Sequence, residues 1–110
     1  MAAKFELKKA ANGQFMFNLK AGNGEVILTS ETYVAKAAAK DGIAAVRVNA
    51  PLDARYDRRI ATNGQRYFVL NAVNGRVLGT SETYSSAQAM EDGIAAVKRD
   101  APGAPLEDLT

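Results

Sequence analysis

The 110-residue chain contains no cysteine and no histidine. Without cysteine it has no disulfide, no thiolate zinc site and no cysteine nucleophile. Without histidine it lacks the commonest general base and the commonest transition-metal ligand. No apolar run approaches the ~18 residues that a membrane span requires. These absences exclude most familiar enzyme classes, and we expect a protein without catalytic activity, cofactor or metal.

Net charge is also low, because 14 basic residues against 12 acidic ones leave +2. A dedicated nucleic-acid binder shows a stronger excess or a dense basic cluster. The densest basic stretch holds Arg55, Arg58, Arg59 and Arg66 and is interrupted by Asp57. This pattern is typical of a solvated strand edge, where charge blocks edge-to-edge aggregation.

The first nine residues, MAAKFELKK, bring in charge too early for the apolar core of a secretory signal. We therefore expect a cytoplasmic location and no membrane partner.

The chain repeats itself. Residues 12–51 align with residues 63–102 at an offset of 51 without a gap, and 23 of the 40 aligned positions are identical. This similarity indicates an internal duplication. We divide the chain into repeat 1 (4–54) and repeat 2 (55–110). A unit of this length buries too little surface to be robust alone, so we expect one domain, 1–110, with a shared core.

Each repeat begins with apolar–polar alternation that is broken by Asn-Gly pairs. Alternation of period two predicts half-buried strands, and Asn-Gly is a strong hairpin signal, typical of a type I′ turn. In repeat 1 this pattern predicts an antiparallel meander of three strands at residues 5–9, 15–21 and 26–29. Repeat 2 has Asn-Gly pairs at the equivalent positions.

A Thr-Ser-Glu-Thr-Tyr loop closes each meander, at 29–33 and 80–84. Hydroxyl side chains just before a helix favour capping of its N-terminus. Ser85 and Gln88 fit a capping box in repeat 2, and Thr32 is a candidate cap in repeat 1. A less favoured interpretation is an anion site at the helix N-terminus. The candidate cap residues are Ser30, Glu31, Thr32, Ser81, Glu82, Thr83 and Ser85.

A helix is predicted after each loop, because apolar residues recur at helical spacing as far as Pro51 and Pro102. Gly42 and Gly93 interrupt these helices, so we expect either a kink or a close approach to the sheet at each glycine. The segments after the prolines have room for one short extra strand each.

These motifs together resemble the YegP-like family of small bacterial proteins. They are the NGQ turn, the second NG turn, the T-S-E-x-Y loop, the D-G-I-A-A-V helix and the closing A-P, each present twice in order. The resemblance covers residues 4–110. It implies an α+β fold of two tandem pseudo-symmetric β3-α-β repeats. They would form a single antiparallel sheet with two helices on one face and terminal strands exchanged between repeats. It implies a monomer with dimer-like internal symmetry and gives no function, because the family is uncharacterised.

We expect Phe17, Leu19, Phe68 and Leu70 to face the helices as the core. The alternate side chains of the sheet would then form an open face, on which an exposed apolar patch is typical of an interaction site. The candidate interaction residues are Met16, Lys20, Arg59, Tyr67, Val69, Asn71 and Val73.

Three functions remain open. The preferred one is a binding module whose open face contacts a protein. The alternative is binding of single-stranded nucleic acid by the same face, with aromatic side chains stacking on bases and Lys or Arg side chains binding phosphates. The third is a purely structural role. Catalysis is disfavoured, because the pair Glu31 and Glu82 lacks any supporting motif.

Overall fold

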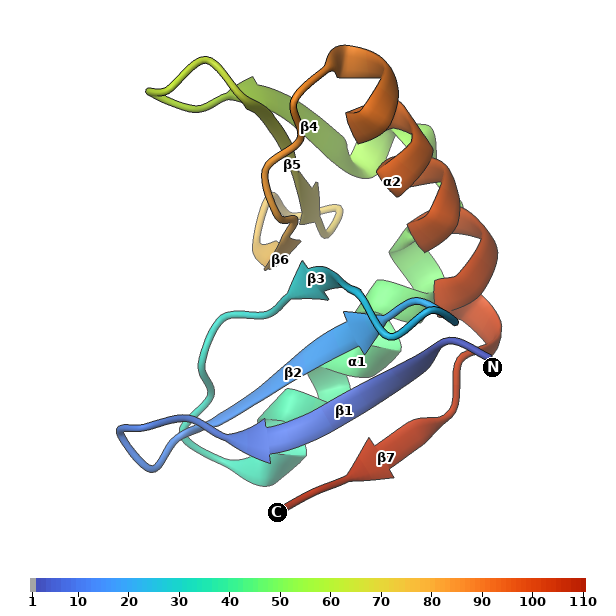
Figure 1. Ribbon diagram of the computed structural model, residues 1–110. Helices are drawn as coiled ribbons and strands as arrows, with labels where there is room; N and C mark the ends of the chain where they lie inside the picture. The colour runs from blue at the N-terminus through green and yellow to red at the C-terminus, as the bar shows by residue number, and fades with distance from the viewer. Residues whose placement is uncertain (1) are drawn as a thin grey trace.

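The computed structural model describes residues 2–110, which form one sheet with two helices against it (Figure 1). In chain order the elements are β1 (Lys4–Lys9), β2 (Phe15–Lys20), β3 (Val26–Thr29), α1 (Lys36–Asn49), η1 (Asp53–Arg55), β4 (Tyr56–Ile60), β5 (Arg66–Asn71), β6 (Val77–Thr80), α2 (Ala87–Asp100), η2 (Ala101–Gly103) and β7 (Leu106–Asp108). The predicted meander and helix therefore occur in both repeats. Neither 14-residue helix, nor any other helical segment of the described chain, is long and apolar enough to traverse a lipid bilayer.

The seven strands lie in the order β4-β5-β6-β3-β2-β1-β7. Strand β7 of repeat 2 pairs with β1 of repeat 1, so the predicted exchange of a terminal strand is confirmed. The prediction of a wholly antiparallel sheet is wrong at this pair, which is parallel, with Phe5 beside Leu106. The reason is the route of the chain. The N–H of Phe5 donates to the carbonyl of Pro105 (2.8 Å), so the chain joins β1 near its first residues and then follows it in the same direction.

Repeat 1 has no separate strand after its helix. The segment Pro51–Asp53, where an extra strand was expected, leads through the short η1 turn directly into β4. Only β7 is therefore an added strand, and the sheet is mixed and unequal at its two ends.

The four Asn-Gly turns share one geometry that differs from the predicted type I′ turn. Glycine alone takes positive φ, for example 82° at Gly13, and no other residue type in the described chain does so. The N–H of Gly13 donates to the carbonyl of Ala10 (3.0 Å), and the side chain of Asn12 accepts from the N–H of Gln14 (3.0 Å). Asparagine thus contributes a side-chain acceptor, and only the glycine needs left-handed backbone.

The four predicted core residues are confirmed, because Phe17, Leu19, Phe68 and Leu70 are fully buried. Both helices cover one face of the sheet (Figure 1). Helix α1 contacts β1 and β2 of its own repeat and also β5 and β6 of the other, while α2 contacts β3 and β5. The two repeats are therefore joined through a single core.

The helix glycines permit close packing, and both helices continue through them. Helix α1 continues through Gly42, and a Cβ there would lie 2.5 Å from the hydroxyl oxygen of Tyr33. Gly93 in α2 is covered in the same way by Tyr84. Of the two expectations, the close approach is correct, and it is made by the tyrosine that ends each Thr-Ser-Glu-Thr-Tyr loop.

Candidate functional site

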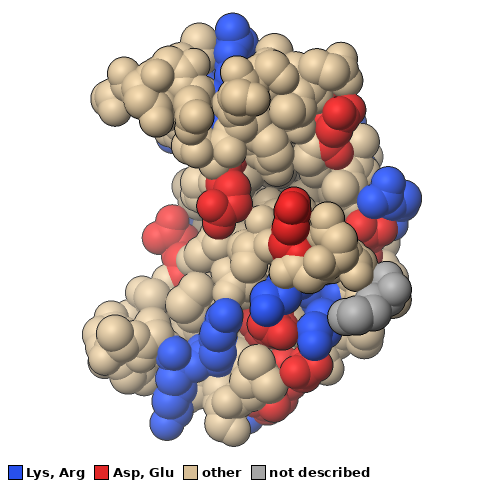
Figure 2. Space-filling view, viewed as in Figure 1, with Lys and Arg blue, Asp and Glu red and all other residues tan. Residues whose placement is uncertain are grey.

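The open face of the sheet carries charged and polar side chains that pair with one another. Its strongest feature is Glu6 on β1, which is only 6% exposed. Its carboxylate lies 3.0 Å from Lys20, 3.4 Å from Lys4 and 3.9 Å from Lys8. The contacts with Lys20, first, and Lys4 lower the pKa of Glu6. Figure 2 shows such basic and acidic side chains interleaved over the half of the molecule that contains β1 and β2.

This face does not form the apolar patch that the alternation predicted. Val69 is buried at 3% exposure, because the strands on either side place Asp57 and Thr80 beside it. Val73 is 76% exposed but lies in the turn after β5, beyond the sheet. Val69 was expected to be exposed and is buried, whereas Val73 is exposed as expected but does not lie on the sheet face.

The other predicted interaction residues lie on the sheet but not in one group. Met16 is on β2 and Tyr67 on β5, with β3 and β6 between these strands. Lys20 pairs with Glu6, and Arg59 lies 2.7 Å from Asp57. Asn71 ends β5 and is partly buried. The structure thus brings together Arg59 and Tyr67, which are register partners, and leaves Met16, Lys20 and Asn71 apart from them.

The Thr-Ser-Glu-Thr-Tyr loops bind the sheet and do not cap the helices, which corrects the predicted role of all seven cap residues. The Ser30 hydroxyl accepts from the N–H of Phe17 (2.9 Å) and donates to the carbonyl of Glu31 (2.7 Å). Ser81 makes the same two bonds in repeat 2. In α2 the N-cap is Ser86, which accepts from Ala89, and α1 begins after Ala35 without a side-chain cap.

The physical reason is an extra pairing that lengthens each loop. Tyr33 bridges to Phe15 and Tyr84 bridges to Arg66, so each helix begins only after the tyrosine has left the sheet. Thr32, Thr83 and Ser85 therefore lie too early in the chain to reach the first helical amides.

The two loops line one shallow groove between β3 and β6, which pair only at Thr29 and Thr80. Its volume is about 550 Å³, and it brings Glu31 and Glu82 into one lining. The lining is formed by residues 29–32 and 80–83. Within residues 2–110 no group of three or more acidic side chains is placed to hold a metal ion.

Sequence reasoning missed the inequality of the two sheet edges. At one end β7 covers β1; at the other, no strand of the described chain covers the outer edge of β4. At the repeat offset β4 is the counterpart of β1, so Tyr56 corresponds to Phe5 and Arg58 to Leu7. The repeat alignment holds the signal, because it matches Leu106–Asp108 of β7 with Arg55–Asp57, which already form the end of η1 and the start of β4.

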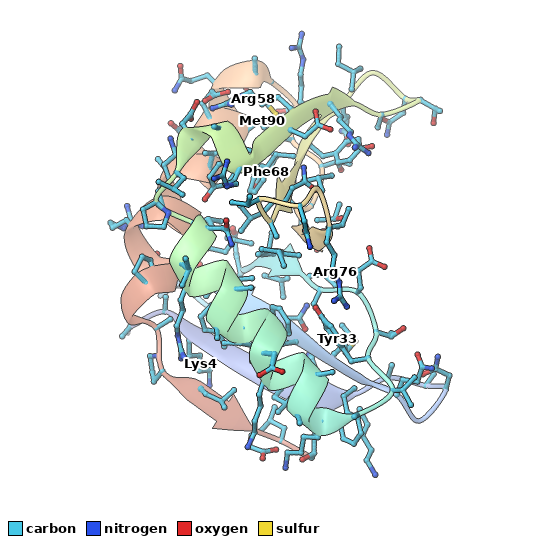
Figure 3. The ribbon with its side chains drawn as sticks, turned by 180° about the vertical axis from the view of Figure 1, so that it is seen from behind. Lys4, Tyr33, Arg58, Phe68, Arg76 and Met90 are labelled. Atoms are coloured by element: carbon cyan, nitrogen blue, oxygen red, sulfur yellow. The ribbon has the colours of Figure 1, made fainter. Side chains whose placement is uncertain are left out.

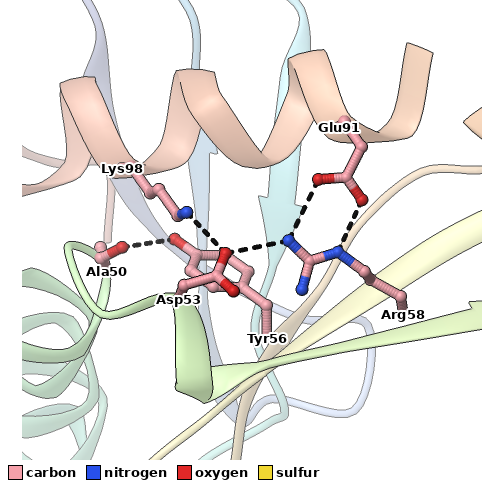
Figure 4. Close-up of polar contacts among 6 residues, drawn as sticks. All are labelled: Ala50, Asp53, Tyr56, Arg58, Glu91 and Lys98. Carbon is pink, nitrogen blue, oxygen red and sulfur yellow. Dashed lines mark hydrogen bonds and ion pairs between the residues drawn. The ribbon is translucent and has the colours of Figure 1, made fainter. Parts of the chain in front are cut away.

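An ion-pair network fixes β4 against α2 (Figure 4). Asp53 accepts from Lys98 (2.7 Å) and Arg58 (2.9 Å), and Arg58 also binds Glu91 (2.6 Å). The hydroxyl of Tyr56 donates to the carbonyl of Ala50 (2.7 Å), and burial raises its pKa. These contacts orient the helix side of β4 and leave its outer edge free.

We expect this network to lose its stabilising effect in acid. Hydrogen bonds from Lys98 and Arg58 lower the pKa of Asp53 from 3.8 to about 2. A carboxylate with a lowered folded-state pKa contributes stability above the unfolded value, and that stability is lost as the pH falls through about 2. The difference in unfolding free energy between the natural protein and Asp53→Asn should therefore shrink between about pH 4 and pH 2. Urea unfolding followed by circular dichroism at several pH values measures it; a constant difference would contradict the prediction.

Comparison with known proteins places the chain in a family. The family described as "Domain of unknown function (DUF1508)" matches residues 10–57 and 61–108, so the two matches begin at the offset of the duplication. A UPF0339 protein of Bordetella pertussis is 56% identical over 110 residues, which span 100% of this chain and 98% of that protein. The UPF0339 protein YegP of Escherichia coli K12 is 49% identical over 100% of both chains.

Two solved structures share the fold. The solution structure of a UPF0339 protein from Shewanella oneidensis has a TM-score of 0.93 at 47% identity, covering 100% of this chain and 93% of that one. The solution structure of YegP from Escherichia coli, described as a protein of unknown function, has a TM-score of 0.94 at 49% identity, covering 100% and 95%. The resemblance drawn from the repeated motifs is thus confirmed: the chain belongs to the DUF1508 family, as a two-repeat UPF0339 protein similar to YegP.

Proposed function

We propose that the protein is a non-catalytic, cytoplasmic binding module that takes an extended segment of a partner protein along the outer edge of β4. The observation that carries this proposal is the asymmetry of the sheet: β7 lies parallel on β1, and the equivalent position on β4 is vacant in the described chain. Addition of a strand to a free edge is a general mode of peptide recognition, in which main-chain hydrogen bonds supply the affinity.

The bonds between β1 and β7 show which groups such a segment would use. The N–H of Phe5 donates to Pro105, and the carbonyl of Leu7 accepts from Leu109, both at 2.8 Å. In β4 the N–H of Tyr56 is already bound to the carbonyl of Asp53. The backbone groups of Arg58 occupy the position equivalent to Leu7 and point outward by the same alternation.

The charges favour an acidic partner segment. Strand β7 has the sequence Leu-Glu-Asp, and its Glu107 is held by Lys4 at 2.8 Å. At the repeat offset Lys4 corresponds to Arg55, which donates to Asn49 (3.1 Å) and lies in η1, directly before the vacant position on β4. Arg59 and Tyr67 lie next to it on the open face. The basic side chains at this edge repel the same edge of a second copy, and together with Tyr67 they complement an acidic, partly apolar strand.

The nucleic-acid alternative has less support. Of the cations that would hold phosphates beside Tyr67 (Lys20, Arg59 and Arg66), Lys20 lies on β2, in the other half of the sheet. Tyr67 and Met16 lie on separate halves of the sheet, so no row of adjacent stacking side chains supports this alternative.

The test is an amide NMR titration of the full-length labelled protein with the peptide Ala-Pro-Leu-Glu-Asp-Leu-Thr, which copies residues 104–110. We expect saturable shifts at residues 55–60 and at Tyr67. Arg58→Pro removes the outward N–H and should abolish them, since proline is tolerated at a strand edge but cannot donate. Arg58→Ala is the matched control: it loses the same ion pairs, keeps the N–H and should still bind.

Several outcomes would overturn the proposal. They are shifts confined to residues 4–9, which would indicate exchange with the protein's own β7, shifts that survive Arg58→Pro, or no shifts. A parallel titration with an octameric single-stranded RNA tests the alternative. Saturable shifts on Tyr67 and Lys20 that persist at physiological salt would support nucleic-acid binding and contradict the proposal of a protein partner.

A further inference from the structure

A second cavity lies between the two repeats, away from the free edge of β4. It is open on one side, has a volume of about 250 Å³ and is lined by α1 and by the turn before β6 and the start of β6. Its apolar wall includes Ala45, Ala72 and Leu78. This size is at or below the low end of ligand pockets, so it suits only a small molecule.

One wall of this cavity carries the hydroxyl of Tyr33, which lies against Gly42 and is open to the cavity. Tyr33 is 6% exposed, yet its hydroxyl makes no hydrogen bond to any of residues 2–110. The hydroxyl of Tyr56, buried to a similar degree at 7%, is bound to the carbonyl of Ala50. The hydroxyl of Tyr33 is therefore available for a hydrogen bond to a molecule in the cavity.

Two opposite charges face the same space from different elements. Asp41 is on α1, and Arg76 follows the second turn of repeat 2. Within residues 2–110 neither side chain forms an ion pair or a hydrogen bond, with each other or with a third group. The guanidinium of Arg76 lies 5.7 Å from the ring centre of Tyr33 and points toward it (Figure 3). The cavity therefore offers one cation, one anion and one hydroxyl around an apolar wall.

We propose that this cavity binds a small amino carboxylate. The carboxylate is held by the guanidinium of Arg76 and the hydroxyl of Tyr33, because guanidinium matches carboxylate geometry with paired donors. The ammonium group is held by Asp41, and the short carbon chain lies against Ala45, Ala72 and Leu78. A ligand with both charges satisfies both side chains, which a simple acid or a simple amine does not.

Repeat 2 supplies an internal control. At the offset of 51 residues Tyr33, Asp41 and Ala72 correspond to Tyr84, Asp92 and Ala21, while Arg76 corresponds to Glu25. The guanidinium that would bind the ligand's carboxylate is thus replaced by another carboxylate. Burial first, and then the charge of Glu25, raise the pKa of Tyr84. The equivalent surroundings in repeat 2 should not accept the ligand.

The test is an amide NMR titration of the full-length protein with glycine, L-alanine, L-valine, β-alanine and 4-aminobutyrate, each used separately. At least one should give saturable shifts at Gly42, Ala72 and Arg76, with none at Gly93, Ala21 and Glu25. Butyrate and butylamine each carry one of the two charges. Each should bind with an affinity lower by about tenfold or more, because one charge-assisted hydrogen bond is lost.

Variants of the lining residues complete the test. Arg76→Gln and Asp41→Asn should each weaken binding by about tenfold or more, and Tyr33→Phe should weaken it without unfolding the protein. Lys40→Gln, an exposed neighbour on α1 outside the lining, is the matched control and should bind normally. Absence of saturable shifts for every amino carboxylate would overturn the proposal. So would equal binding of butyrate, or binding that Arg76→Gln leaves unchanged.

Discussion

Replacing Gly79 by leucine should destabilise the protein by about 3 kcal/mol or more, because the core has no room for the new side chain. A Cβ at Gly79 would lie 2.7 Å from Cγ of Leu28, which is fully buried. The two residues occupy equivalent positions in the two repeats. They meet beside Thr29 and Thr80, where β3 and β6 pair. One leucine fills the space at the pseudo-twofold axis. Chemical denaturation of the variant and the natural protein measures the loss.

The double exchange Leu28→Gly with Gly79→Leu is the control. Leu28→Gly alone leaves a cavity and should cost about 3–5 kcal/mol. The pair should recover about 2–3 kcal/mol relative to the sum of the single changes, because the leucine then enters the same space from the other strand. Additive losses would show that the surroundings of the axis are not interchangeable and would contradict the prediction.

Replacing Phe17 by alanine should lower the free energy of unfolding by about 3–5 kcal/mol. Phe17 is fully buried, meets the edge of Phe5 at 6.0 Å and stacks on Tyr33 at 6.3 Å. Because each helix contacts strands of both repeats, we expect this loss to reach repeat 2 as well. Native-state hydrogen exchange should show the slow amides of β2 and β5 falling together.

The matched variant is Phe68→Ala, the same position in repeat 2, with the same edge and stacked neighbours in Tyr56 and Tyr84. It should give a similar loss and the same joint effect on both repeats. If either variant left the other repeat's slow amides protected, residues 4–54 and 55–110 would unfold separately and the single-domain interpretation would fail.

Local pattern predicted most of the fold. Alternation placed Phe17, Leu19, Phe68 and Leu70 on the core face, because the period of a strand fixes the side on which each residue points. The duplication predicted two copies of each element, and the family match agrees with it. The alternation and the duplication could not predict the direction of β7. Three residues carry no periodicity, and their pairing depends on where α2 delivers the chain.

The candidate site was harder to predict, because it depends on neighbours that are distant in sequence. Val69 was expected to be exposed by alternation, yet the strands beside it bury it. Ser85 and Ser86 both match a capping pattern, and only the bridge between Tyr84 and Arg66 decides that Ser86 is the cap. The cavity at Tyr33 joins two repeats and leaves no local signal.

The pairing of β1 with β7 has a consequence for biosynthesis. Strand β7 is synthesised after β1, and Lys4 of β1 binds Glu107 of β7 across a separation of 103 residues. At a synthesis rate of roughly 5–20 residues per second, the edge of β1 stays uncovered for about 5–20 seconds. During that interval the nascent chain has an open strand at each end of its sheet. Its protection against association with other nascent chains then rests on the lysines of β1 and the arginines of β4.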